Sequence, residues 1–195
     1  ALAFALRADG PRRALLLATA VAHAGLTAAA WVRRPPAQLG GWLLVDDLAA
    51  LFLAVTSGLF LTAACYAVGY LRREGRQQRA DFESGYVFVD APEAAFTGCL
   101  LLFLGAMSLV LTTQHFGLMW VAVEATTLAS APLIHFHRHP RSLEAAWKYL
   151  VICSVGIAIA LLGNFFLVVA TTPVDDRVAG LTVPALTAHA RHHQE

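Results

Sequence analysis

The sequence predicts an all-α fold, a polytopic bundle of transmembrane helices. Of its 195 residues, 58% are hydrophobic and only 14% are charged, and the mean hydropathy is +0.62. Soluble domains carry about 25% charged residues, so this chain has more apolar surface than one small core can bury. The apolar residues gather in runs of the ~20 residues that a spanning helix needs, without the short alternating segments of a barrel.

Five runs are long enough to span a bilayer: 14–32, 43–71, 94–112, 117–136 and 149–170. The opening "ALAFAL" is interpreted as the tail of an earlier spanning helix, because the charged region and cleavage site of a signal peptide are missing. The bundle is therefore predicted over residues 1–172, as part of a longer subunit. Asp46 and Asp47 lie at the start of the second run, where carboxylates suit a helix N-terminus.

Arginines are distributed unevenly between the two faces that these runs define. Nine lie on the face of the first loop and four on the opposite face, which predicts that the first face is cytoplasmic in a cell inner (plasma) membrane. The nine are Arg7, Arg12, Arg13, Arg72, Arg73, Arg76, Arg79, Arg138 and Arg141, and the four are Arg33, Arg34, Arg177 and Arg191.

Two segments outside the runs are polar. The connection 71–93 mixes arginines with acidic residues; it is read as a solvated loop, with contact to a peripheral partner as the alternative. Segment 173–195 begins with a polar turn and continues as an amphipathic stretch too broken to span. We expect it to lie along the non-cytoplasmic surface.

Glu124 is the candidate functional residue, because it interrupts the otherwise uncharged run 117–134. An ionised carboxylate at mid-bilayer costs at least about 2.5–3.5 kcal/mol and is functional by default. A carboxyl group for which ionisation is this costly can take up and release protons. Thr127, Ser130 and Trp120 share roughly its side of the helix, so the hydroxyls could hold the carboxyl group or a water chain. A purely structural carboxylate is the alternative.

Lys148 opens the last run, in "SLEAAWKYL", and has two interpretations. One is a lysine at the membrane boundary, snorkelling or paired with Glu144 at the favourable i, i+4 spacing. The other is the next basic station for a proton passed from Glu124. Ser154 lies deeper in this run and is interpreted as a polar contact between helices. The alternative is that it supports the proton site at Glu124.

The remaining polar residues predict structure rather than chemistry. Pro132 should kink or help to end its helix, and His23 is expected only to pack. The alternating histidines of "HFHRHP" (135–140) have no Cys or carboxylate beside them, so a polar interfacial loop is favoured over a zinc site. A glycine and two small hydroxyl residues at 105, 108 and 112 suggest close helix contact.

Several function classes lack sequence support. Cys65, Cys99 and Cys153 lie in apolar runs without a CxxC pattern, which predicts neither a disulfide nor a metal framework. There is no haem histidine pair, iron–sulfur motif, P-loop or nucleotide-binding glycine motif, so we expect no cofactor and no redox chemistry in this chain. A net charge of +1 gives no reason to expect nucleic-acid binding.

The stretch "GLMWVAVEATTLASAPLIHFHRHPRSLEAAWKYLVICSVGIAIALLG" resembles the proton-translocating, antiporter-like membrane subunits. Respiratory complex I, Mrp-type Na⁺/H⁺ antiporters and group 4 NiFe hydrogenases share these subunits. "EATTLAS" and "LEAAWKY" are most similar to the hydrogenase-4 and formate hydrogenlyase branch, and the resemblance covers roughly residues 40–170. It places Glu124 at the coupling glutamate of helix five and Lys148 in the A-A-x-K pattern.

The resemblance implies an ion-translocating, non-catalytic subunit in the membrane arm of an oxidoreductase complex, beside other membrane subunits and a peripheral hydrogenase or NADH dehydrogenase arm. The chain would hold the end of helix one and helices two to six, and would stop before the family's broken helix. The alternatives are a Mrp-type antiporter or NADH-quinone oxidoreductase subunit, and a truncated membrane scaffold without transport. Neither H⁺ nor Na⁺ is singled out.

Overall fold

Five long helices make up the fold. The structure, a computed structural model, describes residues 3, 8–74, 78–80, 87–89, 91–136, 140–171 and 182–183. The helices are α2 (Asp9–Val32), α3 (Asp47–Glu74), α4 (Glu93–Thr112), α5 (Phe116–Ile134) and α6 (Pro140–Thr171). Each is long and apolar enough to cross a membrane. The predicted fold class and its five spans are therefore confirmed, and the chain is a multi-pass membrane protein.

Three helices begin several residues away from the predicted start, and α2 begins at Asp9 instead of residue 14. The last run was expected from residue 149, but α6 already begins at Pro140, because proline is well suited to the first position of a helix. The second run was expected from residue 43, but α3 begins at Asp47. Asp46 lies just before it and accepts a hydrogen bond from the amide of Ala49 at 2.7 Å, which is the usual geometry of a helix cap.

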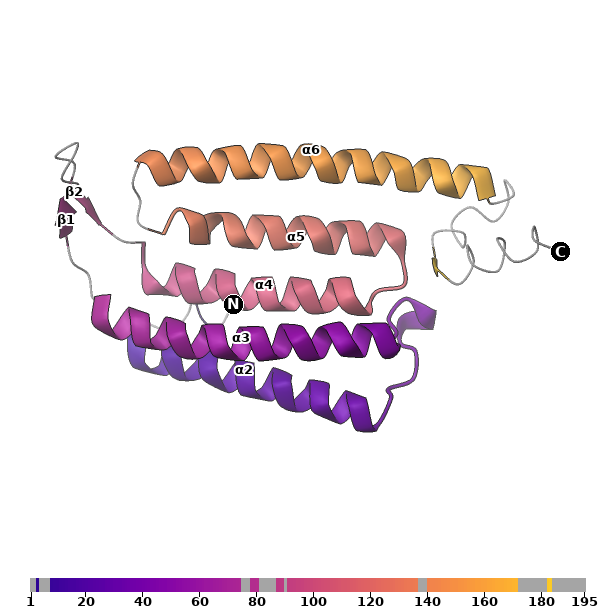
Figure 1. Ribbon diagram of the computed structural model, residues 1–195, viewed down its shortest axis with the longest axis horizontal. Helices are drawn as coiled ribbons and strands as arrows, with labels where there is room; N and C mark the ends of the chain where they lie inside the picture. Colours follow the sequence, from indigo (N-terminus) through magenta and orange to yellow (C-terminus); the bar gives the residue numbers. More distant parts are fainter. Residues whose placement is uncertain are drawn as a thin grey trace.

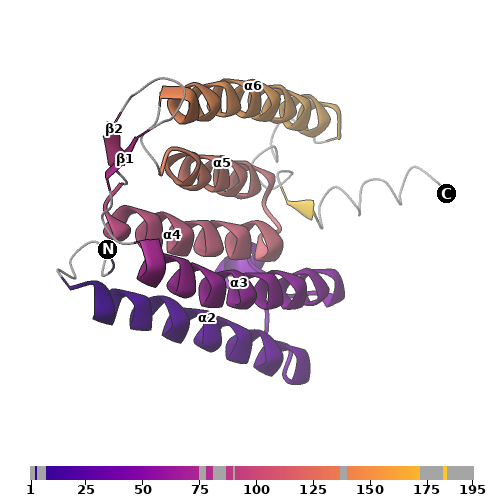
Figure 2. The ribbon, with the colours of Figure 1, turned by 60° about the vertical axis from the view of Figure 1, so that its left-hand side comes forward.

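The helices run antiparallel to their sequence neighbours and lie in the order α2, α3, α4, α5, α6 across the bundle (Figures 1 and 2). The α2–α3, α4–α5 and α5–α6 pairs pack closely, and α4 also contacts α2 and α3. The α6 helix lies at the edge, where α5 is its main neighbour. The bundle therefore consists of a three-helix group, α2 to α4, continued by α5 and α6.

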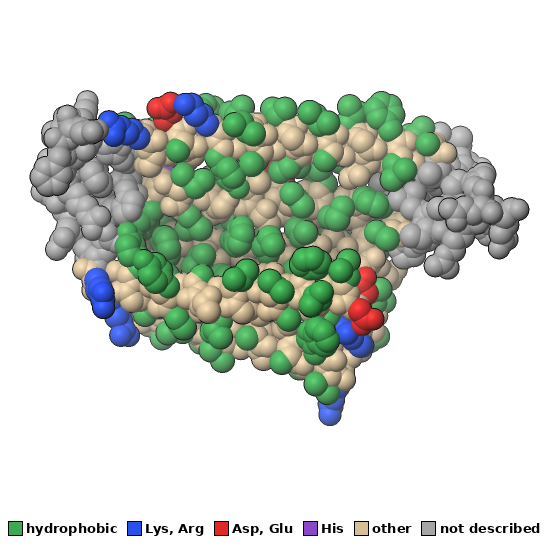
Figure 3. Space-filling view, viewed as in Figure 1, with side chains coloured by type: hydrophobic (Ala, Val, Ile, Leu, Met, Phe, Trp, Pro, Cys, Tyr) green, Lys and Arg blue, Asp and Glu red, His purple; other side chains and the backbone are tan. Residues whose placement is uncertain are grey.

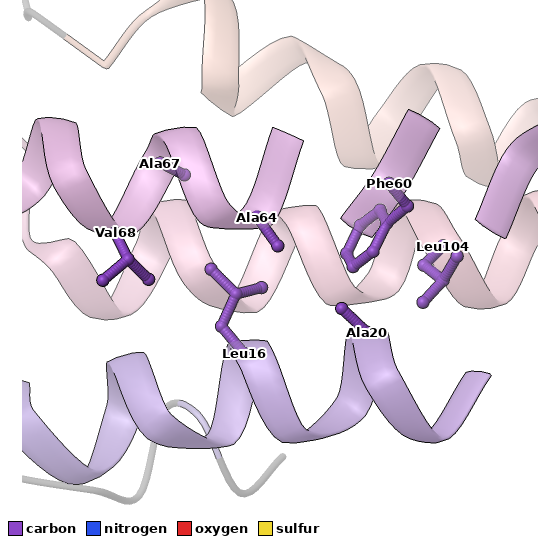
Figure 4. Packing of buried hydrophobic residues seen from close by; sticks show 7 residues of the cluster. All are labelled: Leu16, Ala20, Phe60, Ala64, Ala67, Val68 and Leu104. Carbon is purple, nitrogen blue, oxygen red and sulfur yellow. The ribbon is translucent and has the colours of Figure 1, made fainter. Parts of the chain in front are cut away.

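The buried core lies within the three-helix group (Figure 4). Its cluster consists of Leu16, Ala20, Phe60, Ala64, Ala67, Val68 and Leu104. Small residues alternate with large ones on the facing surfaces of α2 and α3, so the two backbones can approach each other closely.

An ion pair holds one end of this group. Both guanidinium nitrogens Nε and Nη2 of Arg13 in α2 bind the carboxylate of Glu93, at 2.7 and 2.8 Å, and Nη2 also donates to the carbonyl of Leu71 at 3.0 Å. The start of α2, the end of α3 and the start of α4 therefore meet at one end. Beyond α3, a short antiparallel ribbon pairs β1 (Gln78–Ala80) with β2 (Val87–Val89), an element that the sequence did not predict.

At the opposite end of the bundle, the α2–α3 connection and the α4–α5 turn lie together. Between α2 and α3 a single 3-10 turn, η1 (Leu39–Gly41), uses positive φ angles of 66° and 95° at Gly40 and Gly41, which glycine adopts without strain. This connection bonds to the α4–α5 turn through the amide of Leu44 and the carbonyl of Thr112, at 2.8 Å. His115 caps α5 by accepting from the amide of Leu118.

On the face seen in Figure 3, the described helices are apolar along their length and charged near their ends. Leu26 and Ile152 are each 72% exposed, which suits side chains that face lipid or further helices. The expectation of close helix contact at 105, 108 and 112 is wrong for Gly105, where an added Cβ atom would meet no atom within 4 Å, whereas Ser108 does contact α2. "ALAFAL", apart from Ala3, and segment 173–195, apart from 182 and 183, lie outside the described residues.

Candidate functional site

Glu124 lies near the middle of α5, eight residues after Phe116 and ten before Ile134. At a rise of 1.5 Å per residue it is about 12 and 15 Å from the two ends of the helix. Its side chain is half-buried. The carboxylate is therefore at mid-depth in the bundle and partly shielded.

The α6 helix supplies the polar partner of this carboxylate. The hydroxyl of Ser154 donates a hydrogen bond to Oε1 of Glu124 at 3.3 Å. A hydroxyl can donate to the ionised carboxylate and accept from the protonated one, so this contact can persist in either state. Ser154, which the sequence suggested as a supporting residue, is thus the group that reaches Glu124 across the helix interface.

Two further hydrogen bonds join α5 to α6 on either side of Glu124. One turn earlier, the indole Nε1 of Trp120 donates to the carbonyl of Ile157 at 2.9 Å. In the other direction, the hydroxyl of Ser130 lies 2.8 Å from that of Tyr149. Together with the Ser154 contact, these bonds fix the rotation of α6 about its axis, so that Ser154 faces the carboxylate.

The hydroxyls near Glu124 on its own helix do not contact its carboxylate. Thr127 donates to the backbone carbonyl of Glu124 at 2.7 Å, and Ser130 lies 2.9 Å from the carbonyl of Thr127. These are the local back-bonds usual for hydroxyl residues in helices. The sequence missed Tyr149 as the partner of Ser130, since nothing in a single helix indicates a partner on the next one.

Lys148 lies apart from this group. Its side chain is 68% exposed and forms an i, i+4 ion pair with Glu144, which is 63% exposed. This is the pairing that the sequence offered as the first interpretation. Among the described residues, the ammonium group has no hydrogen bond to Glu124, and it lies on a part of α6 that this chain leaves uncovered.

The remaining candidates take structural positions. The α5 helix ends two residues after Pro132. His135 lies 3.1 Å from the hydroxyl of Ser142, while positions 137 and 139 lie outside the described residues. Among the described residues, no group of three metal-ligating side chains occurs.

His23 is not a packing residue alone, contrary to the prediction. Its Nε2 lies 2.9 Å from the hydroxyl of Ser108 in α4, and its Nδ1 lies 2.7 Å from that of Ser57 in α3. Ser57 is in turn 2.9 Å from the hydroxyl of Thr27. The sequence showed an isolated histidine, because these partners lie 85 and 34 residues away.

Comparison with known proteins gives relatives of one kind, although no family model matches the chain. It is 32% identical over 157 residues to "Hydrogenase-4 component F homolog" of Methylacidiphilum infernorum, covering 78% of this chain and 31% of that protein. It is 30% identical over 159 residues to "NADH-quinone oxidoreductase subunit L" of Mycobacterium tuberculosis, covering 78% and 23%. A shorter match, 48% identical over 44 residues, covers 23% of the chain and 13% of "NADH-ubiquinone oxidoreductase chain 2" of Ornithorhynchus anatinus.

The chain thus spans less than a third of the length of the relatives that it matches. The similarity includes both a hydrogenase-4 component and subunits of NADH oxidoreductases, which is the group that the motif around Glu124 resembles. The five apolar helices agree with it. The chain is therefore homologous to the antiporter-like membrane subunits of complex I and hydrogenase-4.

Proposed function

We propose that this chain is part of an ion-translocating subunit in the membrane arm of an oxidoreductase complex of the hydrogenase-4 type, in a cell inner membrane. Glu124 is the group that exchanges the proton, and Ser154 positions it. The observation that carries the proposal is a carboxylate at mid-depth in a spanning helix, held by a hydroxyl from the next helix at 3.3 Å. Carboxyl groups at such depth mark ion pathways by default.

The proposed role of Glu124 is to change its protonation state when electron transfer in a peripheral arm is coupled to the membrane arm. Partial burial makes the anion costly. A cation brought near would favour the anion, and its withdrawal would favour the neutral acid. The Ser154 hydroxyl can follow both states by rotation. Lys148 is proposed as a second, basic station that exchanges protons on the outer side of α6.

The alternatives are a Mrp-type Na⁺/H⁺ antiporter or NADH-quinone oxidoreductase subunit, and a membrane scaffold without transport. The match to the hydrogenase-4 relative supports the hydrogenase-4 reading, and the match to subunit L supports the NADH-quinone oxidoreductase alternative. The Glu124–Ser154 contact weighs against a scaffold, because an apolar residue would pack α5 against α6 without desolvating a carboxylate.

The experiment is proton translocation by the full-length complex in inverted membrane vesicles, measured with a pH-sensitive dye during electron transfer. We expect Glu124→Gln to reduce translocation by about tenfold or more, on the scale that loss of an acid–base group produces, and Glu124→Asp to retain part of it. The control is Asp47→Asn, which removes a carboxylate that is 97% exposed. Normal translocation by Glu124→Gln at a normal electron-transfer rate overturns the proposal.

A further inference from the structure

The interior of the α2–α3–α4 group holds a second polar chain, apart from Glu124. It consists of Thr27, Ser57, His23 and Ser108, linked by contacts of 2.9, 2.7 and 2.9 Å between successive side chains. Thr27 and Ser57 are buried, at 7% and 4% exposure. We name these four linked side chains the His23 relay, and we propose that the relay conducts protons across the bundle between α2 and α4. This proposal rests on the proposed ion-translocating function.

The relay continues the faces that form the apolar core. Figure 4 shows Ala20, Phe60 and Leu104 close together, from α2, α3 and α4. His23, Ser57 and Ser108 lie one helical turn further along these same three faces, at spacings of three or four residues. The core residues close the bundle on one side of the relay, so that its polar groups are held among apolar neighbours.

No charged residue shares this interior. All Asp, Glu, Lys and Arg residues of the three helices lie in their first and last turns or in the flanking residues: Asp9, Arg12, Arg13, Arg33 and Arg34 for α2, Asp46, Asp47, Arg72, Arg73 and Glu74 for α3, and Glu93 for α4. His23 is the only histidine of these helices. The imidazole is therefore the one group of the relay whose side-chain type ordinarily exchanges protons near neutral pH.

The hydrogen bonds of the relay can be satisfied with every donor pointing the same way. Ser108 lies 2.8 Å from the carbonyl of Leu104, to which its hydroxyl can donate. It then accepts from the Nε2–H of His23, whose bare Nδ1 accepts from Ser57, which accepts from Thr27. Each hydroxyl has one proton to donate, so the bond from Ser108 to the carbonyl of Leu104 determines the donor in every other hydrogen bond of the relay.

The same atoms also support the reverse orientation. Ser108 then donates to Nε2 of His23, and the Nδ1–H donates to Ser57, which donates to Thr27. Passage of one proton converts the first orientation into the second. A proton bound at Thr27 displaces the hydroxyl proton of Thr27 to Ser57, and that of Ser57 to Nδ1.

The imidazolium formed in this way gives its Nε2 proton to Ser108, whose own hydroxyl proton passes to a water molecule; water is also the donor of the proton that enters at Thr27. One proton enters, one leaves, and His23 changes tautomer. Rotation of the hydroxyls and exchange of the tautomer restore the first orientation. The relay ends on α4, and α4 packs against α5, the helix that carries Glu124.

A purely structural network makes a different prediction, and His23→Gln separates the two. A glutamine amide can both donate and accept, so it can hold Ser57 and Ser108 together, but it cannot bind a proton near neutral pH. The measurement is proton flux into liposomes that contain the full-length subunit, driven by a potassium diffusion potential and reported by trapped pyranine. Thermal melting of each variant in detergent reports folding.

We expect His23→Gln and Ser57→Ala each to lower the flux by about tenfold or more, with little change in the melting of His23→Gln. Thr62→Ala is the control and should behave as wild type, because Thr62 is exposed and bonds only to carbonyls of its own helix. Ser108→Ala keeps the Ser57 contact and serves if His23→Gln does not fold. Wild-type flux in a folded His23→Gln or Ser108→Ala subunit overturns the relay.

Glu124→Gln in the same assay keeps the two proposals apart. Reduced flux in Glu124→Gln with wild-type flux in His23→Gln removes the relay and leaves the proposed function. Wild-type flux in both variants removes both proposals. Reduced flux in both, with a normal Thr62→Ala subunit, supports the relay as a second proton-conducting element.

Discussion

Arg13 of α2 binds both carboxylate oxygens of Glu93 of α4, although the two residues are 80 positions apart in the sequence. The pair is largely buried, with side chains 20% and 13% exposed. The bidentate geometry is the strong form of an ion pair. Because Arg13 also binds the carbonyl of Leu71, this one side chain ties three helices together at one end of the bundle.

Glu93→Gln should therefore destabilise the bundle by about 2 kcal/mol, the scale for hydrogen bonds to charged groups, because it leaves the guanidinium without its counter-charge. Thermal or denaturant unfolding of the purified subunit in detergent measures this. The matched control is Asp47→Asn, which breaks the exposed pair with Arg34 and should cost less than about 1 kcal/mol. Equal effects of the two variants would contradict the ranking.

Trp120 should contribute to the attachment of α6. Its indole bonds the carbonyl of Ile157 across the α5–α6 interface, and α5 is the main neighbour of α6 among the described helices. Trp120→Phe keeps most of the ring and removes the donor, at a cost of about 1 kcal/mol. We expect faster amide hydrogen exchange in α6 with unchanged exchange in α2 and α3. Trp147→Phe, at a position that is 67% exposed, should leave α6 unchanged.

Ser154 should tune the site without being essential to it. Ser154→Ala removes the hydroxyl that reaches Glu124, and a net loss of about 1 kcal/mol corresponds to roughly fivefold in rate. We expect proton translocation to fall by about that factor, well short of the effect of Glu124→Gln. Ser154→Thr, which keeps a hydroxyl, should retain most of the activity. A loss in Ser154→Ala as large as that in Glu124→Gln would mean that Ser154 itself lies on the proton path.

The sequence predicted the helices well and their contacts poorly, for a physical reason. Length and apolarity determine whether a segment spans a bilayer, and both can be read along the chain. Which side of a helix faces its neighbour is harder to read when the whole circumference is apolar, as in α6. Glu124 and Ser154 were each identified, but their contact depends on the rotation of α6.

Helix starts follow a similar logic. The polar residues Arg141 and Ser142 hid the first turns of α6 from a search for apolar runs, although proline at 140 is a sound helix start. His23 seemed isolated because its hydroxyl partners come from α3 and α4. A search for Ser or Thr at matching depth in neighbouring apolar runs would have found Ser57 as a candidate.

A substitution of Lys148 tests whether this residue takes part in proton transfer or only anchors α6 at the membrane boundary. As a proton station, it should not tolerate Lys148→Met, and translocation should fall by about tenfold or more. Glu144→Gln is the matched control: it frees the ammonium group from its ion pair without removing it, and should leave translocation unchanged, because exposed ion pairs contribute little. Normal translocation by Lys148→Met would remove Lys148 from the proposed pathway and leave Glu124 in place.

The sidedness of the bundle rests on arginine placement, and cysteine labelling tests it. Arg33 and Arg73 are exposed beside opposite ends of the bundle. In a subunit with its native cysteines replaced by serine, we expect an impermeant maleimide to label Arg33→Cys in intact cells. Arg73→Cys should react only after permeabilisation, because we expect the arginine-rich end to face the cytoplasm. The reverse labelling pattern would invert the bundle in the membrane, and with it the side from which a proton reaches Glu124.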